Sequence, residues 1–220
     1  MGIIIRQSFK ATIVNYIGML LGAFNIIILF PLVLTSTEIG LIRLLFDVAL
    51  LFATFAQLGI SVTMVRFFPY FKNDEKKHNG FFFFTIAQPL IGFITTCTLV
   101  LVFKEAIISK YSANSPLFVD YFYWLFPLAF FTLFLIYFET VSSLVSRIVV
   151  PKLIREVVVR ILVILSLFVF YFGWISFSTL VIFQISIYLI ALIANYIYAS
   201  KMIEISLKPD FSIITPEFKK

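Results

Sequence analysis

Residues 38–71 read EIGLIRLLFDVALLFATFAQLGISVTMVRFFPYF, a long apolar run with a few charged residues in it. The run exceeds the length of about 20 residues that an α-helix needs to cross a hydrocarbon core. At 100° per residue, Arg43, Asp47 and Gln57 fall on one side of a single helix predicted over 43–65. An ionisable group at mid-bilayer costs about 2.5–3.5 kcal/mol even on the gentlest scale. We therefore expect this polar stripe to face protein or a water-filled cavity rather than lipid.

The composition of the whole chain belongs to a membrane protein. Of 220 residues, 62% are hydrophobic and only 13% are charged, and the mean hydropathy is +1.09. This balance excludes a water-soluble domain. The net charge of +6 does not indicate a nucleic-acid partner, because the basic residues cluster between apolar runs instead of along one continuous face.

The residue types that carry most enzyme chemistry are scarce. The chain holds one histidine, His78, and one cysteine, Cys97, too few for a histidine-based triad or a His/Cys metal site. None of the common glycine-rich phosphate-binding motifs is present. We therefore predict no catalytic residues, no metal site and no enzymatic activity.

Six apolar runs predict an all-α, polytopic membrane helical bundle. The predicted spans cover 13–34, 43–65, 81–103, 119–141, 157–172 and 175–199. Residues 1–205 would form one six-helix lobe, and the polar tail 206–220 a cytoplasmic linker. Residues 147–160 are expected to form a basic loop interrupted by Pro151. Most Lys and Arg residues lie on the side of the two termini, which the positive-inside rule places in the cytoplasm.

The candidate functional residues are the polar groups inside these spans. Seven candidates for a substrate pathway are Asn15, Asn25, Arg43, Asp47, Gln57, Arg66 and Glu139. Simpler roles compete with this interpretation. Arg43 and Asp47 can form an i, i+4 ion pair, and Arg66 can extend its charge to the lipid headgroups. The asparagines, with Gly18 and Gly22, can serve helix packing alone.

A second group of candidates is basic. Arg147, Lys152 and Arg155, together with Arg160, are expected to form a rim at the cytoplasmic surface. Such a rim can face the lipid headgroups, or it can gather an anionic lipid pyrophosphate at the mouth of a cavity. Composition does not separate these two uses.

The first two spans also carry short motifs of a known transporter family. These are Tyr16-Ile17-Gly18, Phe30-Pro31, Glu38-Ile39-Gly40-Leu41, Leu58-Gly59 and Arg66-Phe67-Phe68-Pro69. They resemble the N-terminal lobe of polysaccharide-type (O-antigen) flippases in the multidrug/oligosaccharidyl-lipid/polysaccharide exporter superfamily. The second half of the chain resembles this family mainly in the spacing of its spans.

This resemblance implies a transporter of the bacterial cytoplasmic membrane. It would flip undecaprenyl-pyrophosphate-linked oligosaccharide for polysaccharide or lipopolysaccharide biosynthesis, by alternating access between two six-helix lobes. The partner would be a C-terminal lobe missing from this sequence, or a second copy of the chain. No cofactor is implied, although H⁺ or Na⁺ could act as a coupling ion. Two alternatives stay open: a cation-coupled drug exporter of the same superfamily, and a non-transporting membrane scaffold in polysaccharide assembly.

Overall fold

The computed structural model describes residues 2–73, 77–112 and 115–209, and this part of the chain contains helices and no strand. Five helical segments in it are long and apolar enough to cross a membrane: Ile5–Val33, Ser36–Ala56, His78–Val102, Phe122–Leu144 and Phe177–Met202. The predicted all-α bundle is confirmed. By helix length and composition, the chain is a multi-pass membrane protein.

Three of these segments combine several helical elements, and the third of the five joins the end of the 3₁₀ turn η2 (Lys77–Gly80) to α5 (Phe81–Val102). The first runs through α1 (Gly2–Ala23), the π-helical η1 (Phe24–Leu29) and α2 (Phe30–Val33). The fourth joins the 3₁₀ turn η3 (Phe122–Trp124) to α8 (Leu125–Leu144). The predicted linker 206–220 lies largely outside the described residues, since α11 (Phe177–Met202) is followed by an irregular segment that is described only to residue 209.

The predicted basic loop over 147–160 is wrong, because most of it is helical. Three elements, α9 (Val149–Leu153), the π-helical η4 (Ile154–Val158) and α10 (Val159–Tyr171), form one uninterrupted helix. Pro151 lies in its first turn, where a backbone N–H has no helical partner and a proline does not break the helix. The helix predicted over 157–172 therefore begins eight residues earlier and carries Lys152, Arg155, Glu156 and Arg160.

The single helix predicted over 43–65 is also wrong. It divides into α3 (Ser36–Ala56) and α4 (Ile60–Phe71), separated by a turn in which Leu58 and Gly59 have positive φ angles of 48° and 74°. The side chain of Gln88 on α5 (Phe81–Val102) donates to the Leu58 carbonyl at 2.8 Å. Gly92, one turn further along α5, lies against the Ala56 carbonyl with no room for a side chain. The break is thus held by α5.

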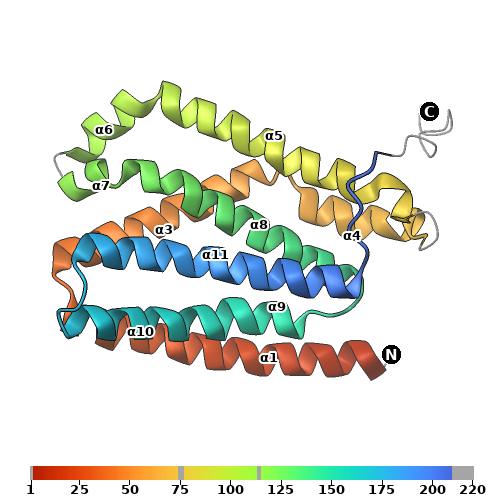
Figure 1. Ribbon diagram of the computed structural model, residues 1–220, viewed down its shortest axis with the longest axis horizontal. Helices are drawn as coiled ribbons and strands as arrows, with labels where there is room; N and C mark the ends of the chain where they lie inside the picture. Colours follow the sequence, from red (N-terminus) through yellow and green to blue (C-terminus); the bar gives the residue numbers. More distant parts are fainter. Residues whose placement is uncertain (1, 74–76, 113–114, 210–220) are drawn as a thin grey trace.

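The helices run along one common direction, with loops gathered at two ends (Figure 1). Along one side, α1 lies beside α9 and α10, and α11 covers α10. In the middle, α8 packs against both α3 and α11. On the opposite side, α5 lies on α3 and α4 and leads into α6 (Lys104–Ser112), then α7 (Pro116–Asp120). The N-terminus, the end of α4 and the end of α11 share one end of the bundle.

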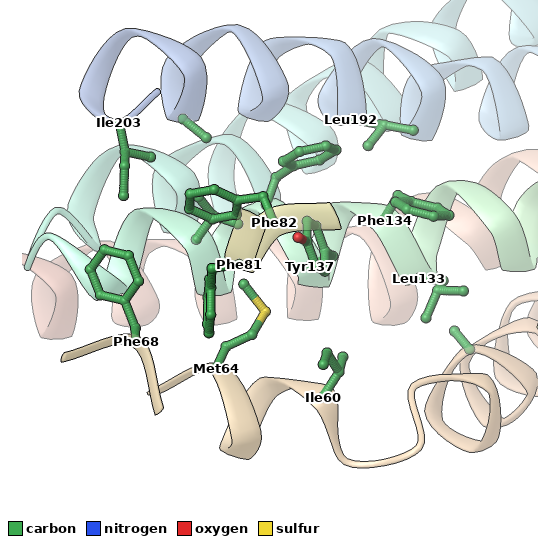
Figure 2. Close-up of a cluster of buried hydrophobic side chains, with 14 of the residues drawn as sticks. Ile60, Met64, Phe68, Phe81, Phe82, Leu133, Phe134, Tyr137, Leu192 and Ile203 are labelled. Carbon is green, nitrogen blue, oxygen red and sulfur yellow. The ribbon is translucent and has the colours of Figure 1, made fainter. Parts of the chain in front are cut away.

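A buried aromatic cluster fixes α4 against the rest of the bundle (Figure 2). Met64 and Phe68 of α4 meet Phe82 at the start of α5 and Tyr137 of α8. The Tyr137 hydroxyl lies 2.9 Å from Thr85 Oγ1, so the one polar atom of this large buried ring has a partner. His78, in the turn η2 (Lys77–Gly80) before α5, is buried against Phe68 and is part of this packing.

Candidate functional site

A polar cavity of about 460 Å³ lies between four helical segments of the bundle. The walls come from α3, α8, α11 and the helix formed by η4 and α10. Its lining residues are Phe46, Asp47, Leu50, Thr132, Leu135, Ile136, Arg155, Glu156, Val159, Arg160 and Tyr188. Four of these side chains carry charge, although they belong to helices of a membrane protein. We call this space the charged cavity.

An ion-pair network forms one wall of the charged cavity. Arg155 donates to Glu139 of α8 at 2.7 Å and lies 3.1 Å from Glu156 on its own helix. Glu156 in turn pairs with Arg160 one turn later, at 2.8 Å. The four side chains of the network are 15% to 37% exposed, so the network is only partly buried. It links α8 to the η4–α10 helix through partly exposed charges.

The N-terminal helix contacts this network through hydrogen bonds with Arg160. Arg160 donates from Nη1 to the Gly18 carbonyl, and its own carbonyl accepts from Asn25 Nδ2 at 3.2 Å. A Cβ atom on Gly18 would lie only 2.7 Å from Glu156 Cβ, and one on Gly22 would overlap the Arg160 guanidinium. The glycine pair thus allows α1 to approach the charged helix closely, as small residues do in membrane bundles.

Both π-helical segments lie at this contact. Asn25 belongs to η1, while Arg155 and Glu156 belong to η4. A π-turn inserts one extra residue in a helical turn and shifts the direction of the side chains that follow, and such turns often occur at functional sites. We attribute the inward position of Arg155 and Arg160 to η4.

The structure separates the polar stripe predicted on residues 38–71. Both Arg43 and Asp47 are exposed, but Asp47 lines the charged cavity, while Arg43, one turn away, lines no part of it. No ion pair joins Arg43 to Asp47 in the described part of the chain, so the simple i, i+4 pair is not formed. Gln57 caps the end of α3 at the helix break and is half-buried.

The remaining predicted residues occupy three environments. Asn25 and Glu139 belong to the network and its support, while Asn15 is exposed on α1. Arg66 lines a second, shallower groove of about 430 Å³ between α4 and α8, which shares no lining residue with the charged cavity. We call it the α4–α8 groove.

Of the predicted basic rim, Arg147 alone lies exposed in a connection, the turn after α8. Lys152 is half-buried in α9, and Arg155 is turned into the bundle toward Glu139. A loop would have kept these three residues together at the surface, and the helical conformation of 149–158 is the reason that they separate.

Sequence reasoning missed one member of the network, Glu156, and predicted Arg160 only as part of the basic rim. One signal could have found the pair: Glu156 and Arg160 have the i, i+4 spacing of a helical ion pair. Pro151 followed by that spacing favours a helix that begins near residue 149.

Buried amides on α11 add a further polar feature to the interior. Gln184 and Asn195 are almost completely buried, and Gln184 Nε2 and both amide atoms of Asn195 have no hydrogen-bond partner in the described protein. An unpartnered amide in an apolar interior is unfavourable by several kcal/mol on the strictest scale, about 4–8 kcal/mol.

The chain matches no protein-family model, no curated protein and no solved structure. The geometry of the site, together with the motifs of the first two spans, is therefore what indicates a function.

Proposed function

We propose that the protein is one lobe of a membrane flippase for lipid-linked oligosaccharide, and that the charged cavity lies on the path of the substrate headgroup. The observation that carries the proposal is Arg155, a guanidinium held between Glu139 and Glu156 on the wall of a polar cavity inside a membrane bundle. Charged residues within membrane spans mark substrate and ion pathways by default, and Glu139, the partner of Arg155, lies within the candidate span Phe122–Leu144. The motifs of the first two spans, which resemble polysaccharide-type flippases, supply the substrate class.

The chemistry of the cavity suits a pyrophosphate headgroup. A guanidinium presents a planar fork of N–H donors that matches phosphate oxygens, and Arg155 and Arg160 offer two such forks. In the unloaded state their charges are satisfied by Glu139 and Glu156. The oxygens of an entering diphosphate would replace these carboxylates as partners of the two guanidinium groups. Each guanidinium charge would then be paired before, during and after this exchange. The lipid tail would remain in the bilayer.

This exchange suggests how a coupling ion could take part. When Arg155 turns to the substrate, Glu139 loses its partner in a partly buried position. Binding of H⁺ or Na⁺ to the freed carboxylate would remove the cost of leaving it unpaired. The coupling ion would then be bound only while the substrate is bound.

The proposal also includes the membrane, the orientation and the partner of the lobe. We place it in a bacterial cytoplasmic membrane with both termini in the cytoplasm, because the basic residues of the loops favour that orientation. Asn15, Arg43 and Thr54 are exposed on membrane helices, and such polar positions favour contact with a second lobe or a second copy across a hydrated cleft.

One observation favours a second candidate, a cation-coupled exporter of amphipathic cations. Asp47 lines the charged cavity and has no ion-pair partner among the described residues, so a cationic drug could neutralise it. A transport assay on the complete transporter separates the two candidates. The protein is reconstituted in liposomes, and movement of a fluorescent undecaprenyl-pyrophosphate oligosaccharide between the leaflets is compared with transport of a cationic dye.

The flippase proposal predicts movement of the pyrophosphate lipid, no movement of the dye, and no movement of a neutral glycolipid with the same sugar. Dye movement without lipid movement would replace the proposal with the exporter. Movement of neither substrate, by a protein that co-purifies with glycosyltransferases, would support the scaffold alternative.

A further inference from the structure

The α4–α8 groove is a second polar feature of the bundle, apart from the charged cavity. The groove is lined by Ser61, Val62, Val65, Arg66, Thr140 and Ser143. It joins three hydroxyl groups and one guanidinium to two apolar side chains. Nothing in the proposed transport step uses this combination.

The polar atoms of the groove include donors without acceptors. The single Thr140 hydroxyl proton has two acceptors within reach, the Ile136 carbonyl at 2.9 Å and Ser61 Oγ at 3.2 Å. Ser143 donates to the Thr140 carbonyl at 2.6 Å, so these two hydroxyls are engaged. The Ser61 hydroxyl donates to no described residue. Arg66 makes one contact, with the ring of Phe67 at 5.7 Å, and no ion pair or hydrogen bond in the described part of the chain. The Arg66 side chain lines the groove and is exposed, and a guanidinium with unused donors favours an anionic acceptor such as a phosphate.

The apolar side chains of the groove limit what this acceptor can be. Val62 and Val65 are 74% and 57% exposed, on the surface where an acyl chain would lie. A free phosphate ion would leave this surface uncovered. A phospholipid would cover it with a chain while its phosphate meets Arg66 and Ser61.

The position along the bundle agrees with a headgroup. Arg66 lies five residues before the end of α4, and the exposed Tyr70 and Lys72 follow it. Tyrosine and lysine side chains at a helix end are typical of the membrane interface. The N-terminal end of α1 and the C-terminal end of α11, which carry Lys10 and Lys201, share this end of the bundle (Figure 1). Basic residues at one membrane surface attract anionic lipids.

We propose that the α4–α8 groove binds one anionic phospholipid, with its phosphodiester on Arg66 and the Ser61 hydroxyl and an acyl chain along Val62 and Val65. This inference goes beyond the proposed transport function and does not depend on it.

The test counts lipids on the complete protein by native mass spectrometry. The purified protein receives phosphatidylglycerol or phosphatidylcholine, and Arg66→Gln is compared with Lys10→Gln, an exposed basic residue of α1 at the same end. Wild type and Lys10→Gln should bind phosphatidylglycerol in preference to phosphatidylcholine. Arg66→Gln should bind phosphatidylglycerol roughly fivefold more weakly, the size of one lost basic contact with an anionic lipid. Ser61→Ala should weaken binding in the same direction.

Three results would overturn the proposal. Equal phosphatidylglycerol binding by wild type and Arg66→Gln would show that the groove is not the site. Displacement of the lipid by inorganic phosphate alone would assign the groove to a free anion. Displacement of bound phosphatidylglycerol by undecaprenyl pyrophosphate, with no reverse displacement by excess phosphatidylglycerol, would assign the groove to the transported substrate.

Discussion

Arg155 on η4 and Glu139 on α8 form an ion pair of 2.7 Å that joins two helices across the wall of the charged cavity. The two residues are 16 positions apart in the sequence, and the turn between α8 and α9 brings them together. The Arg155 side chain is 37% exposed and the Glu139 side chain 15%. The pair is therefore partly buried, and its loss should affect stability.

Removal of one partner of this pair should destabilise the bundle. Breaking a fully buried ion pair costs about 3–5 kcal/mol, and the partial exposure here reduces our expectation for Arg155→Gln to about 2 kcal/mol. The double variant Glu139→Gln/Arg155→Gln should recover most of this loss, because no unpaired carboxylate remains. Apparent melting temperatures in detergent measure both. A double variant as unstable as Arg155→Gln would show that the Glu139 charge is not the cause.

The glycines of α1 and α3 should respond to alanine in opposite directions. Gly18→Ala places a methyl group 2.7 Å from Glu156 Cβ and 2.8 Å from the Glu156 carbonyl, which is backbone and cannot move aside. We expect α1 to separate from the charged helix and the melting temperature to fall. A methyl group on Gly40 in α3 would meet no atom within 4 Å, so Gly40→Ala should stabilise the protein by about 0.5–1 kcal/mol through helix propensity. Equal effects of the two substitutions would contradict the close approach of α1.

The helix break should depend on Gln88. Gln88→Met removes the donor to the Leu58 carbonyl, and a buried or lipid-facing carbonyl without a partner costs about 1–3 kcal/mol. Gln57→Met is the matched control, because this side chain lies at the same break and makes no hydrogen bond in the described structure. The melting temperature should fall for Gln88→Met and change little for Gln57→Met. A comparable fall in melting temperature for both variants would show that the loss comes from an apolar side chain at the break and not from the lost hydrogen bond to the Leu58 carbonyl.

Two buried asparagines offer a further contrast. Asn195 has no hydrogen-bond partner among the described residues, so Asn195→Leu should leave stability unchanged or raise it. Asn25 donates to the Arg160 carbonyl at 3.2 Å, so Asn25→Leu should lower stability by about 1 kcal/mol. Thermal unfolding measures both. A clear loss of stability in Asn195→Leu would show that an internal water or another partner is bound to this amide.

The sequence predicted the helical class and four of the long helices well, because apolar runs of membrane length leave few alternatives. It failed where helix geometry changes locally. The break at Leu58 and Gly59 depends on Gln88 and Gly92 of another helix, which no local pattern reveals. The sequence did not predict that a helix begins at Val149, because the basic composition of 147–160 is typical of a loop between membrane spans.

The candidate site was predicted only in part, because local changes of helix geometry again decide where its side chains lie. Asp47, Glu139, Asn25 and Arg155 are all among the predicted candidates, yet the prediction places Arg155 at the surface instead of against Glu139. Arg155 lies in the π-turn η4, and a π-turn has no reliable signature in a single sequence. Arg43 belongs to the same predicted stripe as Asp47 but lies outside the cavity. The sequence of one helix does not show which part of its polar face a neighbouring helix covers.

The most direct test of the proposed function measures transport by the double variant Glu139→Gln/Arg155→Gln in the complete transporter. This variant removes the guanidinium without leaving an unpaired carboxylate, so a loss of activity is not a loss of folding. Provided that its melting temperature is close to that of wild type, the proposal predicts at least a tenfold lower flipping rate for the pyrophosphate-linked oligosaccharide, equivalent to about 1.4 kcal/mol or more. A well-folded double variant that flips the lipid at the wild-type rate would contradict the assignment of Arg155 to the substrate path.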